Sequence, residues 1–311
     1  LGDKNAVLPA FVALNPVAGP SNSFLPPEDA PFGVNPNGAT LPNTTNSDGQ
    51  TALDRRLALT LQLDNEMQED PLGPGPTQLA QFRTKARTLS YNTAVNSIFN
   101  IDTATRTAYG SSTFGNAAAT ARNLIKSGMG TRFVQISFGS WDHHTNIYQA
   151  NNNLQLMARQ FDAGMAQMIA DMKKDGTFDN TLIIAMGEFG RTTGPLTQNG
   201  GRDHLLQQAT LIAGGKVKGG RAIGATNAAG DSVVDPGWSG DRNIWPEDIE
   251  ATIYSALGID YTKVIHAPEL GRGCHYYHVQ DLVSGWRASK ARILSTSSVG
   301  SGAGFRVAAS A

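Results

Sequence analysis

The chain has 311 residues, of which 40% are hydrophobic and 16% charged, so it is long enough to bury one large core or two small ones. Its 25 basic and 26 acidic residues are interspersed and give a net charge of −1, which excludes the basic stripe that nucleic acid or an anionic membrane surface requires. No stretch reaches the ~20 consecutive apolar residues of a transmembrane segment, and a single cysteine excludes an internal disulfide. The chain begins at Leu1 rather than at a methionine, which indicates a processed form or a fragment.

Residues 1–76 hold 11 of the 15 prolines. Because proline fixes φ and has no N–H to donate, this stretch predicts an extended, wrapping segment with turns. Docking on the body of the protein and disorder are both open for it, and apolar side chains such as Leu8, Val12 and Phe32 favour docking. Leucines at helical spacing begin at Leu53, and a second helical pattern runs over 77–99.

Helices and strands are predicted to alternate along the rest of the chain. The pattern indicates helix 116–129, strand 132–138, helix 151–175, strand 181–186, an apolar run over 209–213 and helix 245–257. A strand, a long helix and a second strand form a right-handed crossover unit, and an almost continuously apolar strand is typical of a buried parallel sheet. The sequence therefore predicts an α/β fold with a mostly parallel central sheet. We expect an α/β domain over 77–290 and a flexible or loosely docked tail over 291–311.

Polar side chains follow the predicted strands at three loops, where parallel sheets collect their chemistry. Asp142 and His144 are two residues apart, so an extended loop points both to one side and His143 to the other. Carboxylate and imidazole together suit zinc or manganese better than magnesium or calcium. The candidate metal ligands are Asp142, His144, Glu188, Asp203 and His204, with Arg191 as a candidate anion-binding side chain because its planar fork matches a phosphate or sulfate.

Ordinary structural roles compete with this interpretation. An isolated Asp-His pair near a turn is usually a cap or a surface hydrogen bond, and Glu188 and Arg191 could simply pair with each other. The recurrence of acid, histidine or arginine at three successive loops favours a site. No nucleophile is identifiable, because Ser140 and Thr145 are expected only to shape the loop.

The order SWDHH, a long helix, GEFGRT and then GGRDH resembles a bacterial family of uncharacterised, sulfatase-like proteins in the alkaline phosphatase superfamily. The resemblance implies an alkaline-phosphatase-like three-layer sandwich, incomplete at its amino-terminal side. It also implies export by the twin-arginine route, to the periplasm or the outside of the cell. One or two divalent ions would orient a small anionic ester or glycan. Phe189 departs from the family pattern, which has a histidine there in many members.

Residue by residue, the resemblance matches Asp142 and His144 to an Asp-His ligand pair, Glu188 to the acidic residue of the next loop, and His204 with Asp203 to a later ligand. The preferred hypothesis is a metal-dependent hydrolase or transferase acting on a phosphate or sulfate ester. The alternative is a non-catalytic envelope or extracellular structural protein with the same fold, and a third reading is a module that binds an anionic glycan or lipid without cleaving it. Expected partners are a second copy of the chain or a missing amino-terminal piece.

Overall fold

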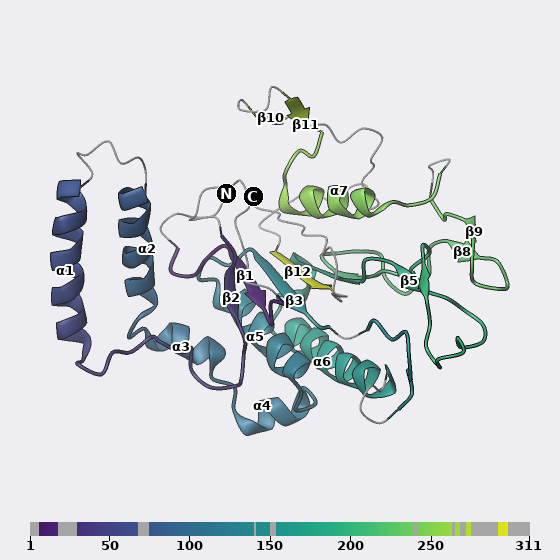
Figure 1. The fold of residues 1–311 in the computed structure, drawn as a ribbon, viewed down its shortest axis with the longest axis horizontal. Coiled ribbons are helices and arrows are strands. Elements are labelled where there is room, and N and C mark those ends of the chain that lie inside the picture. The colour runs from purple at the N-terminus through teal and green to yellow at the C-terminus, as the bar shows by residue number, and fades with distance from the viewer. Residues whose placement is uncertain are drawn as a thin grey trace.

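The computed structural model describes residues 6–17, 30–67, 75–139, 141–149, 154–238, 242–262, 265–267, 272–274 and 292–297. At its centre lies a six-stranded sheet in the order β2-β1-β3-β12-β4-β7 (Figure 1). The first five strands of this order are parallel, and β7 is antiparallel to β4. The bounds are β1 Phe11–Leu14, β2 Phe32–Val34, β3 Phe133–Ser137, β4 Thr181–Met186, β7 Leu211–Gly214 and β12 Arg292–Ser297.

Three short antiparallel ribbons lie outside this sheet. They pair β5 Gly190–Arg191 with β6 His204–Leu205, β8 Ala225–Thr226 with β9 Val233–Asp235, and β10 Ile265–Ala267 with β11 Arg272–Cys274. The helices are α1 Gln50–Met67, α2 Gly75–Leu89, α3 Thr93–Phe99, α4 Thr103–Ala108, α5 Thr113–Ser127, α6 Leu154–Lys174 and α7 Pro246–Leu257, and a 3-10 turn, η2, spans Phe178–Asn180.

The sheet is covered on both faces because the side chains of its strands alternate between them. In β4, Ile183 and Ala185 pack into one core together with α5 and α6, whereas Leu182 and Ile184 pack into a second core with α7. Helices α5 and α6 accordingly lie below the sheet and α7 above it in Figure 1. This two-sided burial explains why 181–186 is almost entirely apolar.

Helices α5 and α6 approach each other closely at Gly164, where a Cβ would lie 2.8 Å from the ring of Phe114 and 3.4 Å from the Cα of Gly115. A Cβ at Gly115 would lie 2.1 Å from the carbonyl oxygen of Tyr109, at the end of α4. The Ser112 hydroxyl accepts a hydrogen bond from the N–H of Gly115 and caps α5, which ends at Gly128 in the left-handed conformation. The first strand to follow, β3, is therefore held firmly against this helix pair.

The α/β class predicted from the sequence is confirmed, but a full alkaline-phosphatase-like sandwich is not shown. Apolar residues of the proline-rich stretch, among them Leu8, Val12 and Val34, are buried, so its described strands are docked. β12 pairs with β3 and β4 inside the stretch 291–311, and the remainder of that stretch lies outside the described residues. The division at 76 and 290 stays a prediction. None of the described helices combines the length and hydropathy that a bilayer crossing demands.

Candidate metal centre

The first two side chains of the site come from the loop that follows β3. Asp142 and His144 are partly exposed, whereas His143 between them is buried. The loop turns at Asp142, where the N–H of His143 donates to the carbonyl of Trp141 at 3.0 Å, and His143 lies on the inner side of the loop. Trp141 stacks edge-on against Phe138 just after the strand, with ring centroids 5.5 Å apart, which anchors the start of the loop.

The third side chain comes from the ribbon formed by β5 and β6. Arg191 is paired with His204 in this ribbon. The N–H of Thr192 donates to the carbonyl of Asp203 at 2.9 Å, and the N–H of Asp203 donates to the Thr192 hydroxyl at 3.1 Å. The arginine and the histidine are thus brought side by side although 13 positions separate them in the sequence.

The loop and the ribbon contact each other through their backbones. The N–H of Arg202 donates to the carbonyl of His143 at 2.9 Å, and Thr145 forms a β-bridge with Gly200. Gly201 makes this approach possible, because a Cβ there would lie 2.0 Å from the carbonyl carbon of His144. Only glycine allows the two segments to approach this closely.

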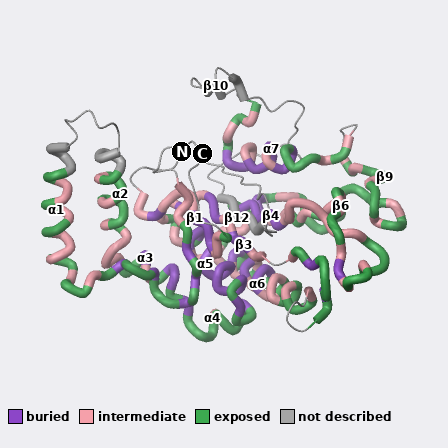
Figure 2. Tube along the Cα trace, in the orientation of Figure 1, coloured by how far each residue is buried: buried purple, intermediate pink, exposed green. Residues whose placement is uncertain are grey.

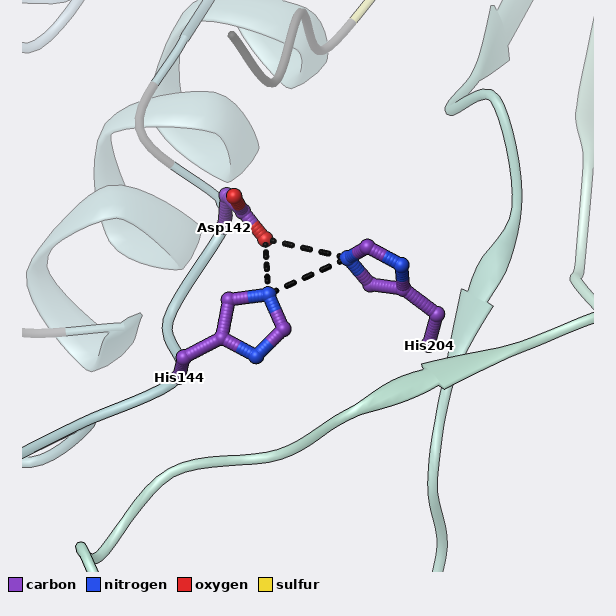
Figure 3. Close-up of side chains that lie close together, drawn as sticks. All are labelled: Asp142, His144 and His204. Atoms are coloured by element: carbon purple, nitrogen blue, oxygen red, sulfur yellow. Dashed lines mark hydrogen bonds and ion pairs between the residues drawn. The ribbon is translucent and has the colours of Figure 1, made fainter. Parts of the chain in front are cut away.

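Three side chains converge as a result (Figure 3). The Nε2 atom of His144 lies 2.9 Å from Oδ1 of Asp142 and 3.1 Å from Nε2 of His204, and the latter lies 3.5 Å from the same Asp142 oxygen. Ligand atoms bound tetrahedrally to Zn²⁺ at about 2.0–2.1 Å lie about 3.3 Å apart. The three observed separations bracket that value, so these residues fit a metal of this size.

The cluster is open to solvent on one side. The side chains of Asp142, His144 and His204 keep 33%, 42% and 52% of their surface exposed. Three protein ligands with an open side are the usual composition of a catalytic metal site, whereas structural zinc sites have four closed ligands. The arrangement leaves room for a water molecule or a substrate oxygen as a further ligand.

Arg191 contacts the same atoms that a metal would use. Its Nη2 donates to Oδ1 of Asp142, and its Nη1 lies 3.3 Å from Nε2 of His144 and 3.3 Å from the carbonyl of Arg202. The hydrogen bond and the charge of Arg191 lower the pKa of Asp142, despite its partial desolvation, with a smaller contribution from His144. The carboxylate is therefore held in its ionised, ligand-competent form.

The other two predicted ligands lie elsewhere. Asp203 does not face the cluster centre: its Oδ1 lies 3.2 Å from Nδ1 of His144, the ring nitrogen on the far side from Asp142. A carboxylate in that place orients a histidine ligand and selects its tautomer. Glu188 is not among the grouped side chains, and its carbonyl oxygen accepts a 3.5 Å hydrogen bond from Gln208.

Phe189 has a role that its sequence position did not reveal. Its ring lies 4.1 Å from the ring of His204, and the guanidinium of Arg191 lies over it at 5.5 Å. The phenyl group thus contacts both functional side chains. The sequence places Phe189 two residues before Arg191, which is a signal for the contact between these two side chains. The contact between Phe189 and His204 exists only because β5 pairs with β6.

One family model matches the chain, that of a protein of unknown function (DUF1501), over residues 1–276. No curated protein and no solved structure matches it. The matching family is not a sulfatase family, so the resemblance to sulfatase-like proteins and the expected membership of the alkaline phosphatase superfamily are wrong. The match includes the proline-rich stretch from residue 1, and the expectation of an amino-terminally shortened sulfatase-like protein is wrong with it. Motif order over three loops was not specific enough to distinguish the two families.

Proposed function

The chain belongs to the DUF1501 family of proteins of unknown function, and we propose its function from the site alone: a metal-dependent hydrolase or transferase acting on a phosphate or sulfate ester. The observation that carries the proposal is the convergence of ligand atoms from Asp142, His144 and His204 within 4.8 Å of one another. Their mixed oxygen and nitrogen donors favour zinc or manganese over magnesium or calcium. One ion is all that this ligand set can hold.

Each side chain has a part in this proposal. A bound divalent ion supplies Lewis-acid polarisation of the ester oxygen and stabilises developing negative charge. Asp142 and the two histidines hold that ion, and Asp203 keeps His144 in the tautomer whose Nε2 is free to coordinate. Arg191 binds the anionic oxygens of the ester through its paired N–H groups. To do so, it exchanges its contact with Asp142 for one with the substrate.

Metal binding is tested first, on the full chain. We expect one equivalent of Zn²⁺ or Mn²⁺ by elemental analysis after dialysis and by competition with a chromogenic chelator. The variants His144→Ala and His204→Ala should each lose at least ~100-fold in affinity, since even the loss of a residue behind a ligand costs 10–100-fold. His266→Ala, in β10, is the matched control. Stoichiometric binding that neither site variant weakens would contradict the proposal.

Turnover is tested next with p-nitrophenyl phosphate and p-nitrophenyl sulfate. We expect metal-dependent release of p-nitrophenol that His204→Ala abolishes. Arg191→Gln should retain the bound metal and raise KM, because it removes the charge that holds the anion and leaves the ligand atoms in place. An Arg191→Gln protein with unchanged KM would remove Arg191 from substrate binding.

The alternative is a non-catalytic structural protein of the envelope or extracellular space, and one observation favours it. The guanidinium of Arg191 already neutralises Asp142 and contacts His144, so the cluster is stable as an ion-pair network without a metal. This role predicts no hydrolysis of either ester, whether or not one stabilising metal is bound. Location outside the cytoplasm also stays a prediction for both functions.

A further inference from the structure

Arg191 occupies atoms that a metal ion would need. Its Nη2 donates to Oδ1 of Asp142, the oxygen that lies 2.9 Å from Nε2 of His144 and 3.5 Å from Nε2 of His204. Its Nη1 lies 3.3 Å from the same Nε2 of His144. One guanidinium thus contacts two of the three candidate ligand atoms. A metal ion on these atoms and Arg191 in its present position exclude each other.

Arg191 also has contacts that do not involve the candidate ligand atoms. Its Nη1 donates to the carbonyl of Arg202 at 3.3 Å, and its guanidinium lies 5.5 Å from the centre of the Phe189 ring. The backbone of Arg191 is paired with that of His204 between β5 and β6. These contacts hold the side chain beside the cluster when its bonds to Asp142 and His144 break.

The cluster lies outside the buried strands of the sheet. The residues of β5 and β6 are half-buried or exposed, whereas almost all of β4 is buried (Figure 2). The side chains of Arg191 and Asp142 are 22% and 33% exposed, and neither belongs to the two hydrophobic cores. A change of partner by Arg191 therefore requires no repacking of either core.

Metal binding reverses the sign of the charge in this cluster. Without an ion, the carboxylates of Asp142 and Asp203 oppose the single positive charge of Arg191, with the histidines counted as neutral, the form in which they bind metal. A divalent ion changes this balance from one negative charge to one positive charge. The metal-free cluster therefore disfavours an anion, and the metal-loaded cluster favours one.

We propose that Arg191 makes the anion site conditional on the metal: without an ion its guanidinium is held by Asp142, and metal binding releases it to hold an anion. The proposal rests on the metal centre of the proposed function and adds the regulation of that site. The ligand class is a tetrahedral oxyanion of the sulfate or phosphate type, because the paired N–H groups of the guanidinium match two of its oxygens. Metal binds first and the anion second.

This competition makes the binding of metal and anion mutually dependent. By linkage, sulfate raises the affinity for Zn²⁺ by the same factor by which Zn²⁺ raises the affinity for sulfate, and we expect at least ~10-fold. Arg191→Gln removes the competitor for Asp142, so it should raise the Zn²⁺ affinity about three- to fivefold, the contribution of one partly exposed ion pair. It should also abolish the effect of sulfate. A side chain that merely supported the ligands would lower the Zn²⁺ affinity when replaced.

The experiment is isothermal titration calorimetry of the full chain with Zn²⁺, with and without sodium sulfate, at one ionic strength set with sodium chloride. The binding of Zn²⁺ to sulfate in buffer alone is subtracted, and circular dichroism checks that each variant is folded. Arg221→Gln is the matched control, because it removes the same charge from an exposed side chain whose Nε donates to the carbonyl of Lys218. It should behave as the wild type does, whereas an effect of net charge alone would change both variants alike and overturn the proposal.

Asp142→Asn tests the same contact without any metal. This variant removes the carboxylate that holds the guanidinium of Arg191. Metal-free Asp142→Asn protein should therefore bind sulfate about three- to fivefold more tightly than metal-free wild type. Equal sulfate affinity of the two proteins would overturn the proposal.

The outcomes separate this proposal from the proposed function. Zn²⁺ binding that His144→Ala weakens, but that neither sulfate nor Arg191→Gln changes, would leave the metal centre standing and overturn the role of Arg191 described here. A wild-type chain that binds no Zn²⁺ would overturn the metal centre and this proposal together.

Discussion

Replacing Gly201 with alanine should dismantle the metal centre without removing any ligand. The added Cβ would lie 2.0 Å from the carbonyl carbon of His144 and 2.1 Å from its oxygen, whereas ordinary contact begins at 3.4 Å. The two segments must therefore separate by 3.4 − 2.0 = 1.4 Å. Metal–ligand distances tolerate about 0.2 Å, so His144 and His204 can no longer bind one ion in their present geometry.

The same shift breaks the 2.9 Å hydrogen bond from Arg202 to the carbonyl of His143, at a cost of about 1 kcal/mol in unfolding free energy. We expect Gly201→Ala to lose at least ~100-fold in Zn²⁺ affinity, comparable to a ligand variant, and to lose the hydrogen bond in addition to the ~1–3 kcal/mol that such overpacking costs. The assay is chelator competition together with urea unfolding. Gly219→Ala is the control, because a Cβ at Gly219 meets no atom within 4 Å. Unchanged zinc affinity in Gly201→Ala would refute the argument that these two loops form one site.

Two further predictions concern the frame of the fold. Gly164→Ala should lower the unfolding free energy by about 1 kcal/mol, because a clash at 2.8 Å with the fully buried Phe114 outweighs the ~1 kcal/mol gain in helix propensity; thermal unfolding measures this, and a raised Tm would contradict it. Burial alone would raise the pKa of Asp175, but hydrogen bonds from Lys126 and Arg122 outweigh it and lower that pKa. The stability contributed by this carboxylate is therefore complete above about pH 4 and is lost as pH falls through its lowered folded-state pKa. In urea unfolding, Asp175→Asn should be less stable than wild type at pH 7, with the difference narrowing below pH 4; a constant difference would exclude this origin.

Elements whose burial is periodic could be predicted from the sequence. The strand over 181–186 has the predicted bounds, and the helix expected over 151–175 begins at Leu154 and ends at Lys174. Both segments have long apolar patterns because their side chains pack into the hydrophobic cores. The sequence argument prefers His144 to His143 on the assumption of an extended loop; His144 does join the cluster, although the loop turns at Asp142 instead of running extended.

The composition of the candidate site could be predicted only in part. The ribbon that brings His204 to Asp142 has two residues in each strand, too few for any hydrophobic period to be visible. Whether Asp203 acts as a ligand or as a support depends on which ring nitrogen of His144 it faces, and this is a property of the folded contact. The prediction of Glu188 as a ligand rests on its position after a strand, and the direction of a side chain that follows a glycine is not determined by that position.

The separation of the two ligand loops along the chain has a consequence for folding. His144 and His204 are 60 residues apart, and the segment between them includes α6 and the strand β4. An ion held by both histidines would act as a reversible cross-link that closes this loop, and closing a long loop restricts the unfolded chain in the manner of a disulfide. In a protein with a single cysteine, such a cross-link would add to the stability that the two hydrophobic cores give α6 and β4, by an amount that rises with metal supply.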